Sequence, residues 1–277
     1  MAYYAWRSNE RFPVFVVRAC LVLWTFLFAF FGVQQRYATA GDRAFLVLGF
    51  SRDAEEQAMP EGWEHISYFG IAENSFSLSR KEGTMILEVK SLNSASALLK
   101  RCDIDLDEYP VLTWRWRVNR SVGMAVERDS GRNDAAARIR AVFGKGTEKE
   151  PFKNVPELKK FFEGRGLVLP VLEPWGYKID YIWATGLRPG EVVDYPGRGT
   201  HKMIALEQGN NRAGRWVWEE RNLQEDFRRL FGMDSPRLSA VLVLSDTDQT
   251  NEGVEAAFSS IVMMKRAGKE EKSAGKQ

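Results

Sequence analysis

The sequence predicts an all-β fold in which two sheets pack face to face, and three observations support this. Apolar and polar residues alternate in many short segments, as they do along strands with one buried face. Gly, Pro, Asn and Asp residues separate these segments at the short intervals that are typical of β-sandwiches. The chain shows no regular alternation of strands with helices, which would indicate a parallel α/β sheet.

Individual segments support this fold class. Five of them fit strands by alternation: residues 84–90, 111–118, 138–143, 178–184 and 215–219. Two more, residues 238–245 and 256–264, are apolar on both faces, as central strands are. The alternation places Trp114 and Trp116 on one strand face, and Trp216 and Trp218 on another. We interpret all four tryptophans as core residues.

Two segments have the spacing of short helices. Residues 222–231 place Leu and Phe side chains on one stripe, with Asn222 as a helix cap and Gly232 at the end. Residues 154–162 have a similar pattern and end near Gly164. We therefore expect two short helices, the second of them as an insertion between strands.

Residues 1–40 have the pattern of a secretory signal peptide. Arginines precede the uncharged apolar run 19–33, and the small residues that end at Ala40 fit a cleavage site. The sequence thus predicts an exported, periplasmic protein with one β-sandwich domain at 41–264 and a disordered polar tail at 265–277. If the segment is not cleaved, the apolar run would instead anchor the domain in the inner membrane, its only expected membrane contact.

Composition excludes several classes of function. Lys and Arg total 39 against 37 Asp and Glu, so no strongly basic surface for nucleic acid is expected. Without the signal segment Cys102 is the only thiol, which rules out an internal disulfide. No serine-hydrolase elbow, zinc-protease motif, phosphate-binding loop or dinucleotide fingerprint is present.

Several motifs occur in an order that resembles a known bacterial family. They are Trp114-Arg115-Trp116, the strand from Asp134 to Arg138, Tyr181 to Trp183, Trp216 to Asn222, Arg228 to Gly232, and the acidic turn from Asp246 to Glu252. In this order they are similar to the exported domain-of-unknown-function family 3047, over roughly residues 63–264, although the stretch 144–174 is longer than the family pattern. The resemblance implies a jelly-roll-like antiparallel sandwich, similar to carbohydrate-binding and galactose-binding-like modules. It implies no reaction.

The acidic turn is a candidate metal site. Asp246, Asp248 and Glu252 lie between two expected strands, and calcium accepts carboxylate oxygens in flexible geometry. A structural calcium ion is therefore one interpretation. The alternative is a solvated turn in which the aspartates bond to nearby backbone groups.

Four arginines form a candidate ligand-binding stripe. Arg115 and Arg117 lie opposite the tryptophans of one strand, and Arg138 and Arg140 lie on a single face of another. If these strands are neighbours, the four guanidinium groups share one sheet face that suits an acidic glycan. The alternative is that they pair with carboxylates on neighbouring strands, such as Asp180.

Two tryptophans outside the strands are candidates for an exposed sugar-stacking platform. Trp63 and Trp175 are flanked by Gly, Pro and Glu, as residues in loops are.

These observations favour an exported, non-catalytic glycan- or ligand-binding β-sandwich. One alternative is a polysaccharide hydrolase that uses loop carboxylates, for which Glu219, Glu220 and Asp226 are the nearest candidates. Adjacent glutamates at a strand end point apart, however, and Asp226 among arginines fits a structural ion-pair network better. A second alternative is an envelope protein-interaction domain. The sequence leaves the oligomeric state open.

Overall fold

A computed structural model describes residues 45–50, 59–81, 83–144 and 176–265, and the statements below concern this part of the chain. The expected signal segment, the expected helix 154–162, Trp175 and the tail from residue 266 lie outside the described residues. No helix among the described residues is long and apolar enough to cross a membrane.

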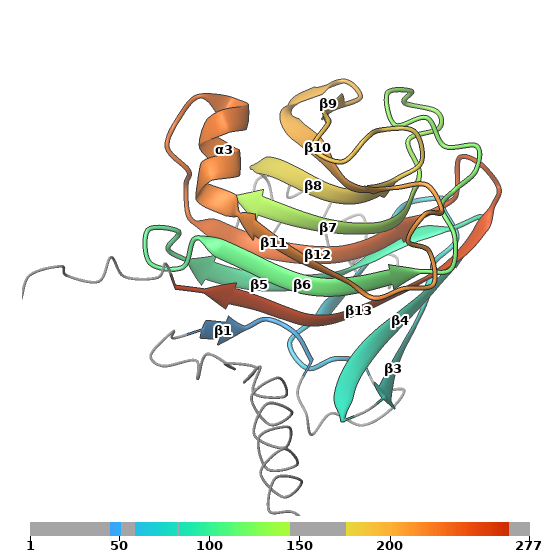
Figure 1. Cartoon of the computed structure of the whole chain (residues 1–277), viewed down its shortest axis with the longest axis horizontal. Coiled ribbons are helices and arrows are strands. Elements are labelled where there is room, and N and C mark those ends of the chain that lie inside the picture. The colour runs from blue at the N-terminus through green and yellow to red at the C-terminus, as the bar shows by residue number, and fades with distance from the viewer. Residues whose placement is uncertain (1–44, 51–58, 82, 145–175, 266–277) are drawn as a thin grey trace, which may run out of the picture. The chain divides into compact units, whose positions relative to one another are not determined.

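The strands form two sheets (Figure 1). The six-stranded sheet has the order β11 (Val217–Asn222), β6 (Val111–Val118), β13 (Gly253–Met264), β4 (Thr84–Leu92) and β3 (Ser75–Lys81), with β1 (Phe45–Val47) also paired to β13. The seven-stranded sheet has the order β2 (Glu64–Ser67), β5 (Ala95–Ile104), β12 (Leu238–Asp246), β7 (Ala135–Phe143), β8 (Tyr177–Ala184), β10 (Arg198–Gln208) and β9 (Val192–Tyr195). The predicted all-β, jelly-roll-like sandwich is confirmed.

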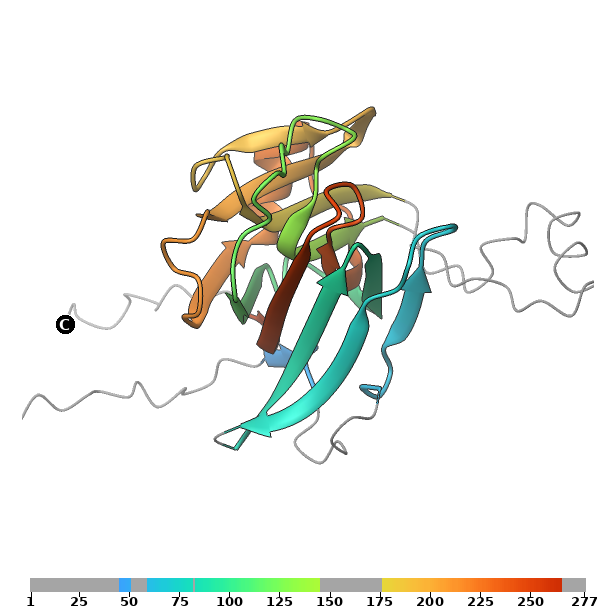
Figure 2. The same ribbon diagram turned by 90° about the vertical axis from the view of Figure 1, so that its right-hand side faces the viewer.

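Strand direction departs from the prediction at one place. Every pair of neighbouring strands is antiparallel except β8 and β10, which run parallel. The short strand β9 lies between them in sequence and pairs antiparallel with β10 at the edge of the sheet. Figure 2 shows the β3–β4 hairpin lying apart from these yellow and orange strands.

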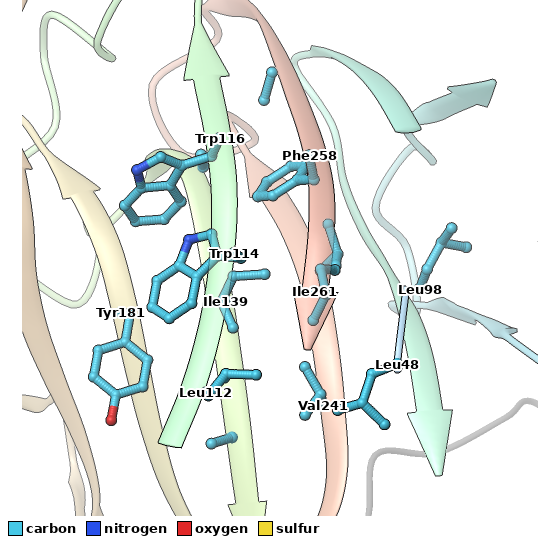
Figure 3. Close-up of a cluster of buried hydrophobic side chains, with 14 of the residues drawn as sticks. Leu48, Leu98, Leu112, Trp114, Trp116, Ile139, Tyr181, Val241, Phe258 and Ile261 are labelled. Carbon is cyan, nitrogen blue, oxygen red and sulfur yellow. The ribbon is translucent and has the colours of Figure 1, made fainter. Parts of the chain in front are cut away.

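The core lies between the sheets and is rich in aromatic rings. Trp114 and Trp116 of β6 meet Tyr181 and Trp183 of β8, with ring centroids 5.5 and 5.9 Å apart. All four side chains are essentially fully buried, as the alternation predicts, and Figure 3 shows the first three together. Burial of each such ring contributes about 4–6 kcal/mol to the apolar term of folding.

Helix α3 (Leu223–Phe231) closes one end of the core. It begins at Asn222, whose side chain accepts a hydrogen bond from the backbone N–H of Glu225, and ends at Gly232, whose φ is 70°. Phe227 packs against Phe143, with centroids 4.9 Å apart. This predicted helix is confirmed. It is the only helix among the described residues, where two were expected.

Strand β11 presents the opposite face from the one predicted. Val217 pairs with Trp116 and Trp218 pairs with Arg115, so Val217 faces the core. Trp218 is 62% exposed and Trp216 is half-buried. The core prediction is therefore wrong for these two tryptophans, because the register with β6 sets the face.

Candidate functional site

A groove of about 610 Å³ crosses the outer face of the seven-stranded sheet, the face turned away from the aromatic core. We call it the cross-sheet groove, and its lining includes Ile66, Tyr68, Ile71, Arg140, Lys178, Tyr195, Arg198, Thr200, His201, Asp246, Asp248 and Gln249. These residues reach from β2 to β10, five strand spacings and so about 24 Å at the usual distance between strands. The groove therefore has room for an extended ligand.

A buried group of charged side chains, the Asp180 cluster, forms part of the groove floor. Asp180 accepts hydrogen bonds from Arg138 Nη1 at 2.7 Å, and from Arg140 Nε at 2.7 Å and Nη2 at 2.8 Å. His201 Nε2 lies 3.0 Å from Asp180 Oδ1, and Arg138 Nη2 lies 3.0 Å from Asp246 Oδ2. Arg138 and Asp180 are completely buried. Buried charges are tolerated only when paired in this way.

The protonation states of the cluster follow from these contacts. Burial alone would raise the pKa of Asp180, but Arg140, His201 whenever it is protonated, and Arg138 hold it well below its usual range. Burial lowers the pKa of His201, against the opposing effect of Asp180. Two guanidinium groups therefore face two carboxylates around a neutral imidazole, and the floor is balanced in charge.

The groove rim carries polar groups next to an aromatic ring. Tyr195 stacks on His201 with ring centroids 4.2 Å apart and an interplanar angle of 2°. Arg198 and Thr200 are exposed in the groove lining, and Asp248, which also lines the groove, is half-buried. The groove lining thus offers hydrogen-bond donors, acceptors and an apolar contact.

The predicted stripe of four arginines is split between the two sheets. Arg115 and Arg117 lie on β6 of the six-stranded sheet, whereas Arg138 and Arg140 lie on β7 of the seven-stranded sheet. The expectation of one shared face is wrong, because strand alternation does not determine which strands pair. The alternative of pairing with Asp180 is confirmed for Arg138 and Arg140.

The aromatic platform expected from two loop tryptophans is not formed by Trp63. This side chain is only 6% exposed and packs against Phe50, with ring centroids 5.6 Å apart. Its expected exposure is therefore wrong, since it belongs to the core. Trp175 lies outside the described residues.

The carboxylates of the acidic turn have different partners. Asp246 accepts from the backbone N–H of Ala135 at 2.6 Å, as well as from Arg138. Glu252 pairs with Arg120 at 2.5 Å and accepts from the N–H of Met124 at 2.8 Å. No group of three potential metal-binding side chains is present among the described residues, and calcium binding stays a prediction.

A further acidic residue, Asp134, lies close to the turn. Asp134 Oδ2 accepts from the backbone N–H and the hydroxyl of Thr250, at 2.9 and 2.7 Å. Burial, followed by the neighbouring charge of Asp246, raises the pKa of Asp134 to about 6. Asp134 is therefore largely ionised only above pH 6.

Sequence reasoning named Glu219 as a candidate carboxylate but missed that it turns inward near a second glutamate, Glu207. Glu219 of β11 accepts from Trp116 Nε1 at 3.1 Å, and Glu207 of β10 accepts from Arg212 Nη1 at 2.6 Å. Burial, and then repulsion from Glu207, raises the pKa of Glu219 to about 7. Glu220 is exposed, so the two adjacent glutamates do point apart. The inward turn of Glu219 follows from the register of β11, which alternation did not reveal.

The ion-pair network expected around Asp226 is confirmed. Its carboxylate lies 2.5 Å from Arg221 Nη2 and 2.9 Å from Arg229 Nη2. It also accepts from the hydroxyl of Tyr181 at 2.9 Å. Asp226 therefore connects α3 to both sheets.

One protein-family model matches most of the β-sandwich. Residues 61–262 match the model of DUF3047, described as a protein of unknown function. The chain belongs to the DUF3047 family. A search of curated proteins finds no match.

Solved structures with a similar fold include sugar-related proteins. The xyloglucanase domain of NopAA, a type three effector from Sinorhizobium fredii in complex with cellobiose, is 10% identical (TM-score 0.41; 75% of this chain, 95% of that chain). Endoglucanase 3 of Trichoderma harzianum, from family GH12, is 6% identical (TM-score 0.40; 81% and 97%). A family 29 carbohydrate-binding module from Piromyces equi is 6% identical (TM-score 0.30; 81% and 92%). These similarities are too distant to support an argument about function.

Proposed function

We propose that this DUF3047 member is a non-catalytic glycan-binding protein and that the cross-sheet groove is its binding site. The observation that supports this most is the groove itself, about 610 Å³ in volume and laid across a rigid sheet. Sugars carry hydroxyl groups that donate and accept hydrogen bonds, and they have apolar faces that pack against aromatic rings. The groove lining combines all three kinds of contact.

Particular residues would make these contacts. Arg198 and Thr200, both exposed at the rim, would donate to sugar hydroxyl groups, and Asp248 would accept from them. Tyr195 is held in place by its stacking on His201, so its ring offers a preorganised apolar contact. The buried Asp180 cluster beneath fixes the strands that carry these side chains.

A glycan array followed by isothermal titration calorimetry tests the proposal. Arg198→Ala and Tyr195→Ala should each weaken binding of a retained glycan by roughly tenfold, about 1.4 kcal/mol. Arg188→Ala is the matched control, because the Arg188 side chain is 80% exposed and does not line the groove. An array with no retained glycan, or an equal loss in the control, would refute the proposal.

A second candidate function is polysaccharide hydrolysis, and the glutamate pair favours it. A carboxyl group with a pKa near 7, as at Glu219, is suited to general acid catalysis, and Glu207 would be the partner carboxylate. Release of reducing ends from the glycans retained on the array tests this activity. Activity that is lost in Glu219→Gln would replace the binding function by a catalytic one.

The proposal includes export. It places the domain in the periplasm, either free after cleavage of residues 1–40 or anchored in the inner membrane by residues 19–33. Cell fractionation and the mass of the mature protein test both forms. Recovery of the protein only in the cytoplasmic fraction would contradict this part of the proposal.

A further inference from the structure

We propose that the outer face of the six-stranded sheet carries a second binding surface, which takes an acidic polysaccharide. The surface consists of Arg117, Trp216, Arg115 and Trp218, which we call the arginine–tryptophan ladder. It lies on the sheet that does not contain the cross-sheet groove. The inference therefore goes beyond the proposed function and stands or falls separately from it.

The ladder arises from the pairing of two neighbouring strands. β11 and β6 are antiparallel, and Trp218 lies directly opposite Arg115. The guanidinium of Arg115 lies 5.0 Å from the ring centroid of Trp216 and 5.4 Å from that of Trp218. The guanidinium of Arg117 lies 5.3 Å from the centroid of Trp216. Cations and rings thus alternate across the strand pair.

Trp218 has the exposure that a stacking platform needs. Its side chain is 62% exposed, although exposed tryptophans are unusual in a folded domain. The cation–π contact with Arg115 restricts the indole from one side. A sugar ring that packs against the remaining surface would therefore meet a group that has already lost much of its rotational freedom.

The charges on this face favour an anionic ligand. Among the described residues, neither Arg115 nor Arg117 has a carboxylate partner, and both are held by tryptophan rings instead. The nearby acids on β4 and β13 already form ion pairs, Glu88 with Lys81 and Glu255 with Lys90 at 3.2 Å. Glu220 is exposed on the same face of β11, but it forms no ion pair with either arginine among the described residues. The planar donor pattern of the two guanidinium groups matches a carboxylate or a sulfate.

A hollow continues the ladder across the sheet. It has a volume of about 330 Å³, and its charged lining consists of Arg117, Lys90 and two glutamates that pair with lysines, Glu88 and Glu255. Arg117 belongs to both the ladder and the hollow, so a chain stacked on Trp218 can extend over Trp216 into the hollow. This continuity fits a polysaccharide better than a single small anion.

Titration with alginate, a polyuronate, tests the ladder, with heparin as a sulfated probe and dextran as an uncharged one. Trp218→Ala and Arg117→Gln should each weaken alginate or heparin binding by roughly tenfold. Raising the salt concentration should weaken the same binding, and dextran should not compete for it. Both side chains reach the surface, so thermal unfolding should show that both variants fold.

Two controls separate the ladder from other sites. Arg188→Gln removes an exposed arginine outside the ladder, and Arg198→Ala removes a cross-sheet groove residue. Both should bind alginate as the unchanged protein does. The inference is overturned if neither anionic probe binds, if the ladder variants bind normally, or if Arg188→Gln loses as much. A loss in Arg198→Ala alone would assign alginate to the groove and also overturn it.

Discussion

Replacing Asp180 by Asn tests how the Asp180 cluster is held together. Asp180 is completely buried and is the carboxylate that both Arg138 and Arg140 contact, at 2.7 to 2.8 Å. Removing its charge takes away the buried carboxylate that both arginines share, while Arg138 keeps its ion pair with Asp246. Breaking a buried pair in this way costs about 3–5 kcal/mol of unfolding free energy. For a domain of this size, this corresponds to a fall in Tm of about 6–20 °C.

Urea denaturation at pH 7, followed by tryptophan fluorescence, measures this effect. The matched control is Asp103→Asn, because Asp103 forms an exposed ion pair with Arg237 at 2.5 Å. Exposed pairs contribute at most about 1 kcal/mol, so this variant should unfold almost as the unchanged protein does. If Asp180→Asn lowered the unfolding free energy by less than about 1 kcal/mol, or by no more than the control does, the Asp180 cluster would not hold these strands together.

Three further predictions concern the pH dependence and the backbone. Because the pKa of Glu219 is raised from 4.5 to about 7 in the folded chain, its protonated form stabilises the fold below pH 4.5, and this contribution is lost as the pH rises through 7. Glu219→Gln should therefore be more stable than the unchanged protein at pH 8, by roughly 1–2 kcal/mol after allowing for solvent screening, and should match it at pH 4. Urea titrations in which the variant and the unchanged protein are equally stable at pH 8 as well as at pH 4 would contradict this. Gly176 has φ of 142°, and a Cβ there would lie 2.1 Å from the carbonyl oxygen of Phe143, so Gly176→Ala should cost more than about 2 kcal/mol of unfolding free energy in the same titrations. A neutral result would show that the backbone segments at Gly176 and Phe143 can move apart to make room for the methyl group. Asn222→Ala removes the cap of α3 and should cost about 1 kcal/mol, with Asn222→Asp as the control that keeps a capping oxygen; equal stability of the two variants would show that the cap contributes little.

Alternation in the sequence predicts strand positions and faces where one face is plainly apolar. Leu112, Trp114 and Trp116 alternate with polar residues, and all three are fully buried in β6. The same holds for Ile179 and Tyr181 in β8. Burial with a period of two is a local property of a strand, so a local pattern is enough to reveal it.

The pattern fails where both faces of a strand have mixed character. Around Trp218 the aromatic rings lie on one face, while Val217 and Glu219 lie on the other. Hydrophobicity favours the tryptophan face as the buried one, but the register with β6 turns it outward and brings Glu219 inward. Register is set by the partner strand, which can be far away in the sequence.

The candidate site was only partly predictable for the same reason. That Arg138 and Arg140 share a strand face follows from their spacing, and Asp180 was a recognisable partner. That β7 and β6 belong to different sheets does not follow from either segment alone. The cross-sheet groove draws residues from β2 to β10, and only the folded topology brings them together.

The short strand β9 has a consequence for self-association. It forms the outer edge of the seven-stranded sheet, and unpaired backbone groups at such an edge can recruit strands from other molecules and so start aggregation. β9 offers only four residues, its register with β10 is irregular between Arg198 and Lys202, and Asp194 places a charge on the edge. A brief, distorted and charged edge is a poor template for intermolecular pairing, so this margin of the sheet helps to keep neighbouring copies apart.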